Sequence, residues 1–85
     1  MFYVYILVSE FKGLRFYVGM TKNIENRIKE HNSGKTKSTK GYVPWKLFSV
    51  ECFISRIEAR KREIYLKSGS AKERIKKNWL KNKNQ

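Results

Sequence analysis

The fold is decided by two short stretches near the N-terminus, FYVYILV at residues 2–8 and RFYVGM at residues 15–20. In each stretch apolar side chains recur at every second position, which is the period of a β-strand. The dipeptide Lys12-Gly13 between them supplies a turn, because glycine tolerates the backbone angles that tight turns require. The two stretches are therefore predicted to form an antiparallel hairpin.

The alternation also predicts which side chains share a face of the sheet. When the apolar sets of the two strands are matched, Tyr5 and Tyr17 lie together on the opposite face. Gly19 then leaves a bare patch beside Tyr17, where a ligand such as nucleic acid can approach the backbone closely. Aromatic residues in strands commonly serve packing alone, so packing stays open as the alternative role of the two tyrosines.

A helix is predicted directly after the hairpin, followed by a loop and a third strand. Thr21 and Asn23 are both suitable residues for the start of this helix, and Gly34 is suitable for its end. A polar and basic loop then covers residues 34–44, and residues 45–53 form the strand. The apolar face of this strand is expected to carry Phe48, Val50 and Cys52.

Two further helices are predicted to close the chain. Ser55 with Glu58, and Ser70 with Glu73, have the spacing of capping boxes, in which both side chains satisfy backbone groups at a helix start. Gly69 lies between the two helices and is expected to end the first of them.

The predicted elements follow the order β-β-α-β-α-α, which places the chain in the α+β class. A three-stranded antiparallel sheet flanked by helices suits a chain of 85 residues, which is enough for one domain. We therefore expect a single domain over residues 1–85, with a basic tail that frays over residues 81–85. A domain of this size has no room for a large enclosed cofactor cavity, so an open and shallow site is expected.

The charge of the chain indicates a polyanionic partner. Twenty residues are Lys or Arg and seven are Glu, with no Asp, which gives a formal net charge of +13. Such a charge repels itself in a folded domain, and a bound nucleic acid relieves the repulsion. Phosphate contacts are expected from lysines in the loop before the third strand and in the last helix. These lysines are Lys35, Lys37, Lys40, Lys72, Lys76 and Lys77.

Several classes of protein are excluded. No apolar run approaches the roughly 20 residues that a membrane helix needs. The run at residues 2–8 is too short for a secretion signal, and no basic residue precedes it. Cys52 is the one cysteine, so it makes neither an internal disulfide nor a cysteine zinc site. We expect a cytoplasmic protein without a membrane partner.

The first predicted helix carries two candidate functional residues. At about 100° per residue, Ile24, Ile28 and His31 share the stripe that faces the sheet. Arg27 lies on the flank of that stripe, one turn before His31, where its planar guanidinium could bind a phosphate. A solvated arginine and a hydrogen-bonded core histidine stay open as the alternatives.

The next helix carries a carboxylate in an unusual position. Glu63 falls on a stripe with Ala59 and Leu66, while Ile57 and Ile64 form a second stripe, which predicts a helix between two layers. A carboxylate on an apolar stripe needs an ion pair or a bound cation, so both roles stay open. Seven scattered glutamates disfavour a two-metal site, and any hydrolysis is expected to use one Mg²⁺ that keeps most of its waters.

These residues together resemble the GIY-YIG nuclease superfamily. Tyr3-Val4-Tyr5 and Tyr17-Val18-Gly19 are similar to its paired motif, with Tyr3 standing where the first motif has glycine. Arg27 and His31 follow where that family carries a helical Arg and, in many members, a His. Residues 59–63 resemble the helix with its metal-binding Glu. The resemblance covers nearly the whole chain and is closest to a small, stand-alone bacterial branch.

The resemblance implies an endonuclease that depends on a divalent metal, Mg²⁺ or Mn²⁺, and that acts on nucleic acid, with DNA as the expected partner. It implies that Tyr17 or Tyr5 activates or orients the attacking water and that Arg27 neutralises charge on the phosphate. Glu63 would hold the metal, and His31 would orient a partner or shuttle a proton. A non-catalytic nucleic-acid-binding module on the same fold stays open, as does an accessory protein that needs a targeting protein partner.

Overall fold

The strand formed by the first stretch lies at the centre of the sheet. In the computed structural model, which describes residues 1–83, β1 (Phe2–Ser9) pairs antiparallel with β2 (Arg15–Thr21) and with β3 (Lys46–Phe53). β2 and β3 therefore form the two edges. The other elements are α1 (Ile24–Asn32), a 3-10 turn (Lys40–Tyr42), α2 (Arg56–Leu66) and α3 (Gly69–Lys83). The predicted α+β architecture and its order β-β-α-β-α-α are confirmed.

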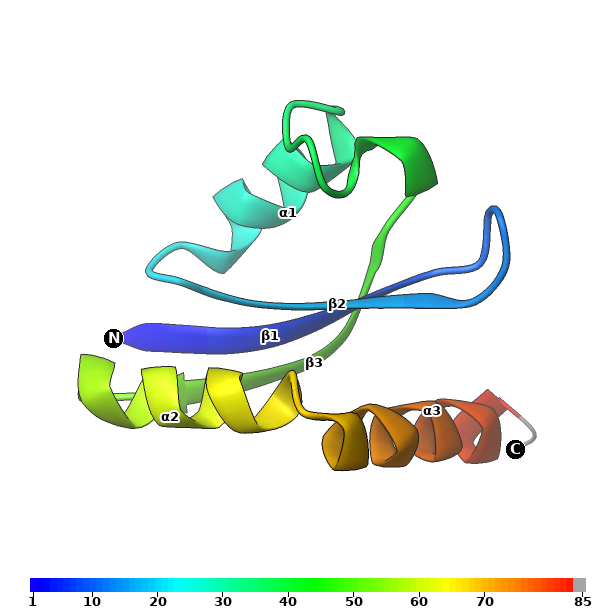
Figure 1. The fold of residues 1–85 in the computed structure, drawn as a ribbon. Helices are drawn as coiled ribbons and strands as arrows, with labels where there is room; N and C mark the ends of the chain where they lie inside the picture. The colour runs from blue at the N-terminus through cyan, green and yellow to red at the C-terminus, as the bar shows by residue number, and fades with distance from the viewer. Residues whose placement is uncertain (84–85) are drawn as a thin grey trace.

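Both faces of β1 are buried, because helices cover the sheet on both sides (Figure 1). On one face Val4, Ile6 and Val18 pack against α2 and α3. On the other face Tyr5 and Leu7 pack against α1 and against the segment that leads into β3. The apolar character of residues 2–8 at nearly every position follows from this double burial.

Local signals at two turns and at the starts of α1 and α2 act as the sequence predicts. Gly13 adopts a φ of +95° in the hairpin turn, and Gly34 adopts +81° after α1. Asn23 caps α1, since its side chain accepts a hydrogen bond from the backbone N–H of Asn26 at 3.0 Å. Ser55 caps α2 by accepting from the N–H groups two and three residues later. These caps fix where α1 and α2 begin, and so which side chains they turn toward the sheet.

The apolar face of β3 differs from the prediction because of a β-bulge. The register with β1 shifts at Phe48, which is an extra residue in β3, and the side-chain alternation restarts after it. Phe48 still packs against the core, but Val50 is 44% exposed and Cys52 is exposed. The expected placement of Val50 and Cys52 is therefore wrong. Ser49 and Glu51 face α2 and α3 in their place.

The start of α3 also differs from the prediction. The hydroxyl of Ser68 accepts from the N–H of Ala71 at 3.4 Å, so Ser68 caps this helix instead of Ser70. Gly69 is the first residue of α3, and its expected role as the end of the preceding helix is wrong. The reason is that Ser68, two residues before the predicted cap Ser70, already accepts from a backbone N–H group that is free at the helix start.

α2 packs on one side only. Ala59, Glu63 and Leu66 are buried as predicted, but Ile57 and Ile64 are 68% and 58% exposed. α3 continues beyond the end of α2 instead of packing along it (Figure 1). The predicted placement of α2 between two layers is therefore wrong.

The last helix continues to Lys83, whose ammonium group pairs with the Glu10 carboxylate. The tail predicted to fray spans residues 81–85, and residues 84–85 lie outside the described residues. No helix within residues 1–83 is both long and apolar enough to cross a membrane.

Candidate active site

Arg27 and His31 meet at the hydroxyl group of Tyr5. This hydroxyl lies 3.0 Å from Nε2 of His31 and 3.4 Å from Nε of Arg27. Tyr5 is 1% exposed and His31 is fully buried, so these contacts form away from water. α1 brings the two groups together because Arg27 and His31 are one turn apart on its side facing the sheet.

The hydrogen bonds around His31 assign its proton. Nδ1 lies 2.9 Å from Oγ1 of Thr39, and the Thr39 hydroxyl donates to the carbonyl of Thr36 at 3.4 Å. Because a hydroxyl has a single hydrogen, Thr39 accepts from Nδ1–H, which leaves Nε2 to accept the hydroxyl hydrogen of Tyr5. Burial lowers the pKa of His31 and the Arg27 cation lowers it further, so the ring is neutral at pH 7.

Arg27 stays a cation in this position. Its Nε donates to the Tyr5 hydroxyl, and its Nη1 donates to a carboxylate oxygen of Glu30 at 2.8 Å. The hydrogen bond to Tyr5 is the main cause that raises the pKa of Arg27. The side chain is 31% exposed, so part of the guanidinium is left for an incoming anion.

The two tyrosines of the site differ in their access to solvent. Burial raises the pKa of Tyr5 to about 12, so this hydroxyl keeps its proton at neutral pH. Tyr17 on β2 is only partly buried, and its ring centroid lies 6.2 Å from that of Tyr5 and 4.7 Å from that of His31. The prediction that both tyrosines share a face is confirmed, and Tyr17 is the less buried of the two.

Gly19 makes room for Tyr5. A Cβ atom at this position would lie 2.4 Å from the Tyr5 hydroxyl oxygen and 2.6 Å from Cζ of the ring. The Tyr5 ring therefore fills the space that the sequence analysis expected to be a bare patch. Any side chain at residue 19 would therefore displace the hydroxyl to which Arg27 and His31 are hydrogen-bonded.

Glu63 is a buried carboxylate that forms ion pairs with two cationic side chains. The residue is 6% exposed, Arg60 Nη1 lies 2.7 Å from Oε1, and Lys67 Nζ lies 3.1 Å from Oε2. Of the two roles left open by the sequence, the ion pair is thus formed. The Glu63 charge also contributes to the raised pKa of Tyr5, so the carboxylate acts on the tyrosine site through space.

A groove of about 490 Å³ runs along the β2 edge from Tyr17 to the start of α3. Three lysines line it: Lys67, which pairs with Glu63, and Lys72 and Lys76, which the sequence analysis predicted to contact phosphates. Tyr17 belongs to the strand segment that lines this groove, but its ring packs on the opposite face of the sheet, with Tyr5 and His31.

The remaining predicted lysines lie elsewhere. Lys77 is exposed on α3 but does not line this groove. Lys35, Lys37 and Lys40 are exposed on the segment between α1 and β3, across the sheet from α3 (Figure 1).

That segment supplies residues of the site that the sequence analysis missed. Trp45 Nε1 donates to the carbonyl of Thr39 at 2.9 Å, and the Trp45 ring lies 6.4 Å from that of Tyr17. The side chain of Asn32 exchanges two hydrogen bonds with the Trp45 backbone, at 2.6 and 3.0 Å. Asn32 thereby fastens the segment over His31. No periodicity marks these residues, and the one available signal was a large aromatic at the start of a strand.

The sequence and the fold of the chain are similar to those of known proteins. The GIY-YIG catalytic domain family matches residues 1–83. A UPF0213 protein of Bacillus licheniformis is 44% identical over 71 residues, which are 82% of this chain and 71% of the relative. A UPF0213 protein of Clostridium perfringens is 47% identical over 66 residues, which are 76% and 69% of the two chains.

A solved structure is also similar. The solution NMR structure of a UPF0213 protein from Bacillus halodurans is 40% identical in sequence and superposes with a TM-score of 0.52. The match covers 88% of this chain and 82% of that one. Sequence and fold therefore point to the same group of small proteins.

Proposed function

The chain belongs to the GIY-YIG catalytic domain family, and we propose that it is an endonuclease that hydrolyses phosphodiester bonds of DNA or a structured nucleic acid with a divalent metal. The observation that carries the proposal is the buried network of Tyr5, Arg27 and His31 beside the partly buried Tyr17, at a sheet edge along which a lysine-lined groove runs.

Arg27 and Tyr17 are the groups that act on the phosphate and on water. The exposed part of the Arg27 guanidinium neutralises charge that develops on the phosphate oxygens. The Tyr17 hydroxyl orients the attacking water, because Tyr17 is the less buried of the two tyrosines.

Tyr5 and His31 position the other two groups. Tyr5 accepts from Arg27 and donates to His31, so its hydroxyl fixes the direction of the guanidinium. The ring centroid of neutral His31 lies 4.7 Å from that of Tyr17, so this packing holds the Tyr17 side chain in place beside the network. Its Nε2 can also take up a proton that passes through the Tyr5 hydroxyl.

Glu63 is suited to hold the metal. Both of its cationic partners are exposed, Arg60 at 60% and Lys67 at 50% of the side chain, so they can move into solvent when a doubly charged ion takes their place. Residues 1–83 contain no cluster of three or more acidic, His or Cys side chains, so Glu63 would be joined by water and substrate oxygens. A bound Mg²⁺ or Mn²⁺ stabilises negative charge on the leaving oxygen.

The groove along β2 is the proposed path of the substrate backbone. Lys72 and Lys76 are one turn apart on α3 and present their charges along the groove beside β2. Cations at this spacing suit successive phosphates, and such contacts carry no base specificity. Lys35, Lys37 and Lys40 would then meet a part of the nucleic acid that extends past α1.

Nicking of supercoiled plasmid by the purified chain tests the proposal. Cleavage is expected with Mg²⁺ or Mn²⁺ and not with EDTA, and it should be lost in Tyr17→Phe and Glu63→Gln. Glu58→Gln is the matched control, because Glu58 is an exposed glutamate on the same helix. Unchanged cleavage in Tyr17→Phe would refute the role given to Tyr17.

The two ion pairs of Glu63 are the observation that favours the alternative, a binding module. In that case plasmid is bound but not nicked with any divalent metal, and Glu63→Gln leaves binding as it was. An accessory protein would be recognised by nicking that begins only when a targeting protein is added.

A further inference from the structure

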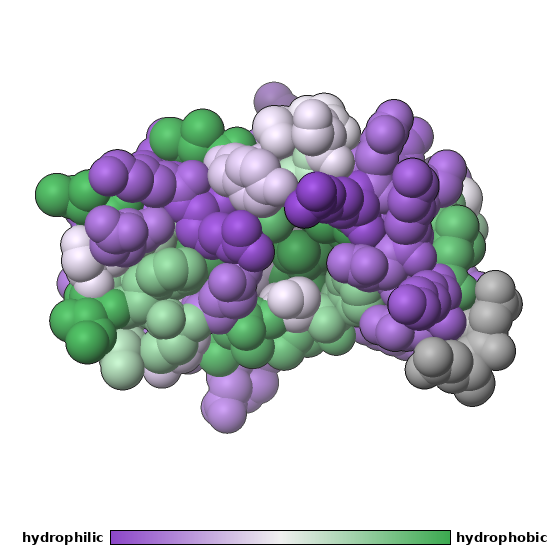
Figure 2. All heavy atoms as spheres, turned by 90° about the horizontal axis from the view of Figure 1, so that it is seen from below, coloured by the Kyte–Doolittle hydropathy of each residue, from purple (hydrophilic) through white to green (hydrophobic). Residues whose placement is uncertain are grey.

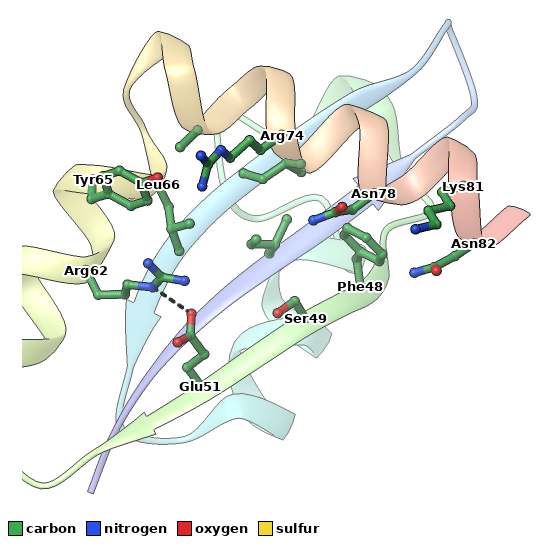
Figure 3. A pocket seen from close by; sticks show the side chains of 13 residues that line it. Phe48, Ser49, Glu51, Arg62, Tyr65, Leu66, Arg74, Asn78, Lys81 and Asn82 are labelled. Carbon is green, nitrogen blue, oxygen red and sulfur yellow. Dashed lines mark hydrogen bonds and ion pairs between the residues drawn. The ribbon is translucent and has the colours of Figure 1, made fainter.

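A second groove lies on the other side of α3, next to β3. It has a volume of about 690 Å³ and opens between β3, the end of α2 and the length of α3 (Figure 3). The lysine-lined groove of the proposed active site lies at the β2 edge, so the two grooves flank α3 from opposite edges of the sheet. None of the residues given a catalytic role lines the second groove.

The charge of this second groove suits an anion. Arg74 and Lys81 on α3 line it, and neither forms an ion pair or a side-chain hydrogen bond within residues 1–83. The one carboxylate in the lining is Glu51, which is neutralised by Arg62 Nε at 2.8 Å (Figure 3). Seen from below, hydrophilic side chains gather over α3, while hydrophobic ones gather at the opposite end of the molecule (Figure 2). The groove therefore has two uncommitted positive charges.

Flat rings and amides lie beside these charges. Tyr65 is 42% exposed at the end of α2, with the guanidinium of Arg62 5.3 Å from its ring centroid. Asn78 and Asn82 are one turn apart on α3 and both line the groove. Their side chains form no hydrogen bond within the described residues, so each amide has a donor and an acceptor available.

We propose that this second groove binds a short segment of single-stranded nucleic acid, separate from the segment at Tyr17. Arg74 and Lys81 contact its phosphates, a base stacks on Tyr65, and the amides of Asn78 and Asn82 contact base edges. A single strand fits better than a duplex, because paired and stacked bases offer neither face nor edge to these groups. The inference rests on the proposed function, because that function makes nucleic acid the polymer that binds on the other side of α3.

The binding of a fluorescein-labelled oligothymidine of about ten nucleotides tests this proposal. Anisotropy is measured with the full chain in EDTA over a series of salt concentrations, so that cleavage plays no part. Arg74→Ala/Lys81→Ala should lower the slope of log affinity against log salt by about 1.4, which is 0.7 for each lost contact to a single strand. Arg56→Ala/Lys61→Ala is the matched control, since it removes one Arg and one Lys that are exposed on α2 outside both grooves.

A second arm tests stacking. Tyr65→Ala should weaken oligothymidine binding by roughly 5- to 150-fold, and Tyr65→Phe should restore it, because the ring and not the hydroxyl carries the contact. A salt slope in Arg74→Ala/Lys81→Ala equal to that of the control pair would overturn the proposal. So would displacement of the oligonucleotide by polyglutamate as readily as by unlabelled oligothymidine, since the groove would then suit an acidic peptide. None of these measurements involves cleavage. The binding result therefore tests the second groove even if the protein fails to nick plasmid.

Discussion

Gly19→Ala should damage both the stability and the activity of the protein, because the added methyl group meets Tyr5. The new Cβ would lie 2.4 Å from the Tyr5 hydroxyl oxygen, whereas ordinary contacts of this kind begin at 3.4 Å. The hydroxyl must therefore move by about 1 Å, and its hydrogen bonds at 3.0 Å to His31 and 3.4 Å to Arg27 cannot both survive.

The size of the effect follows from two costs. Overpacking costs about 1–3 kcal/mol, and leaving the buried Nε2 of His31 without a donor costs about 1–3 kcal/mol more. The unfolding free energy should thus fall by roughly 2–6 kcal/mol, which is a large part of the stability of a domain of this length. Thermal melts followed by circular dichroism measure it, and the midpoint should drop by about 10 °C or more.

Gly69→Ala is the matched control, because a Cβ at Gly69 has no atom within 4 Å and the residue lies in the first turn of α3. This variant should be as stable as the wild type or slightly more so, since alanine favours helix. A Gly19→Ala protein with a wild-type melting temperature and undiminished cleavage would show that the Tyr5 hydroxyl is not held where the structure puts it.

Three further outcomes are expected. Glu63→Gln should abolish metal-dependent cleavage yet change stability by less than about 1 kcal/mol, because the partners Arg60 and Lys67 are exposed and can be solvated; ready unfolding in urea would count against this. Arg27→Ala should slow single-turnover cleavage by roughly 10²–10³ while binding weakens much less. If the cleavage rate and the affinity fall by the same small factor, Arg27 only anchors a phosphate. Burial lowers the pKa of His31, so below pH 6.5 the unfolded chain binds a proton on this histidine that the folded chain does not bind. The free energy of unfolding should therefore decrease as the pH is lowered below 6.5. Urea midpoints at pH 8 and pH 5 measure this, and His31→Gln should flatten the difference.

The sequence predicted those parts of the site that depend on period and on local capping. The alternation of residues 2–8 and 15–20 is enough to place Tyr5 and Tyr17 on one face, because a strand has no freedom to turn one side chain over. Likewise Asn23 fixes the start of α1, and the helical period then directs Arg27 and His31 toward the sheet.

The remainder depends on contacts between distant residues. The bulge at Phe48 has no local signature, since it arises where β3 is fitted to β1. Thr39 and Trp45 reach the site through a segment whose path is set by hydrogen bonds to Asn32, far from any periodic element. Periodicity also could not reveal that α3 leaves Ile57 and Ile64 uncovered, because an apolar stripe gives no information about which neighbour lies beside it.

The central position of β1 affects how a saturation-mutagenesis experiment on this chain would be read. Its alternate side chains belong to the core under α2 and to the network under α1, so a change at Val4 or Ile6 disturbs the backbone that carries Tyr5. Most variants in this strand should therefore lose abundance and activity together. Variants at Lys72 or Lys76 should stay abundant while activity falls, because these side chains are exposed and hold nothing in place. A screen that scores activity alone would rank both groups alike. Measuring the protein level in the same cells would separate residues needed for the folded structure of the site from residues that act on the substrate.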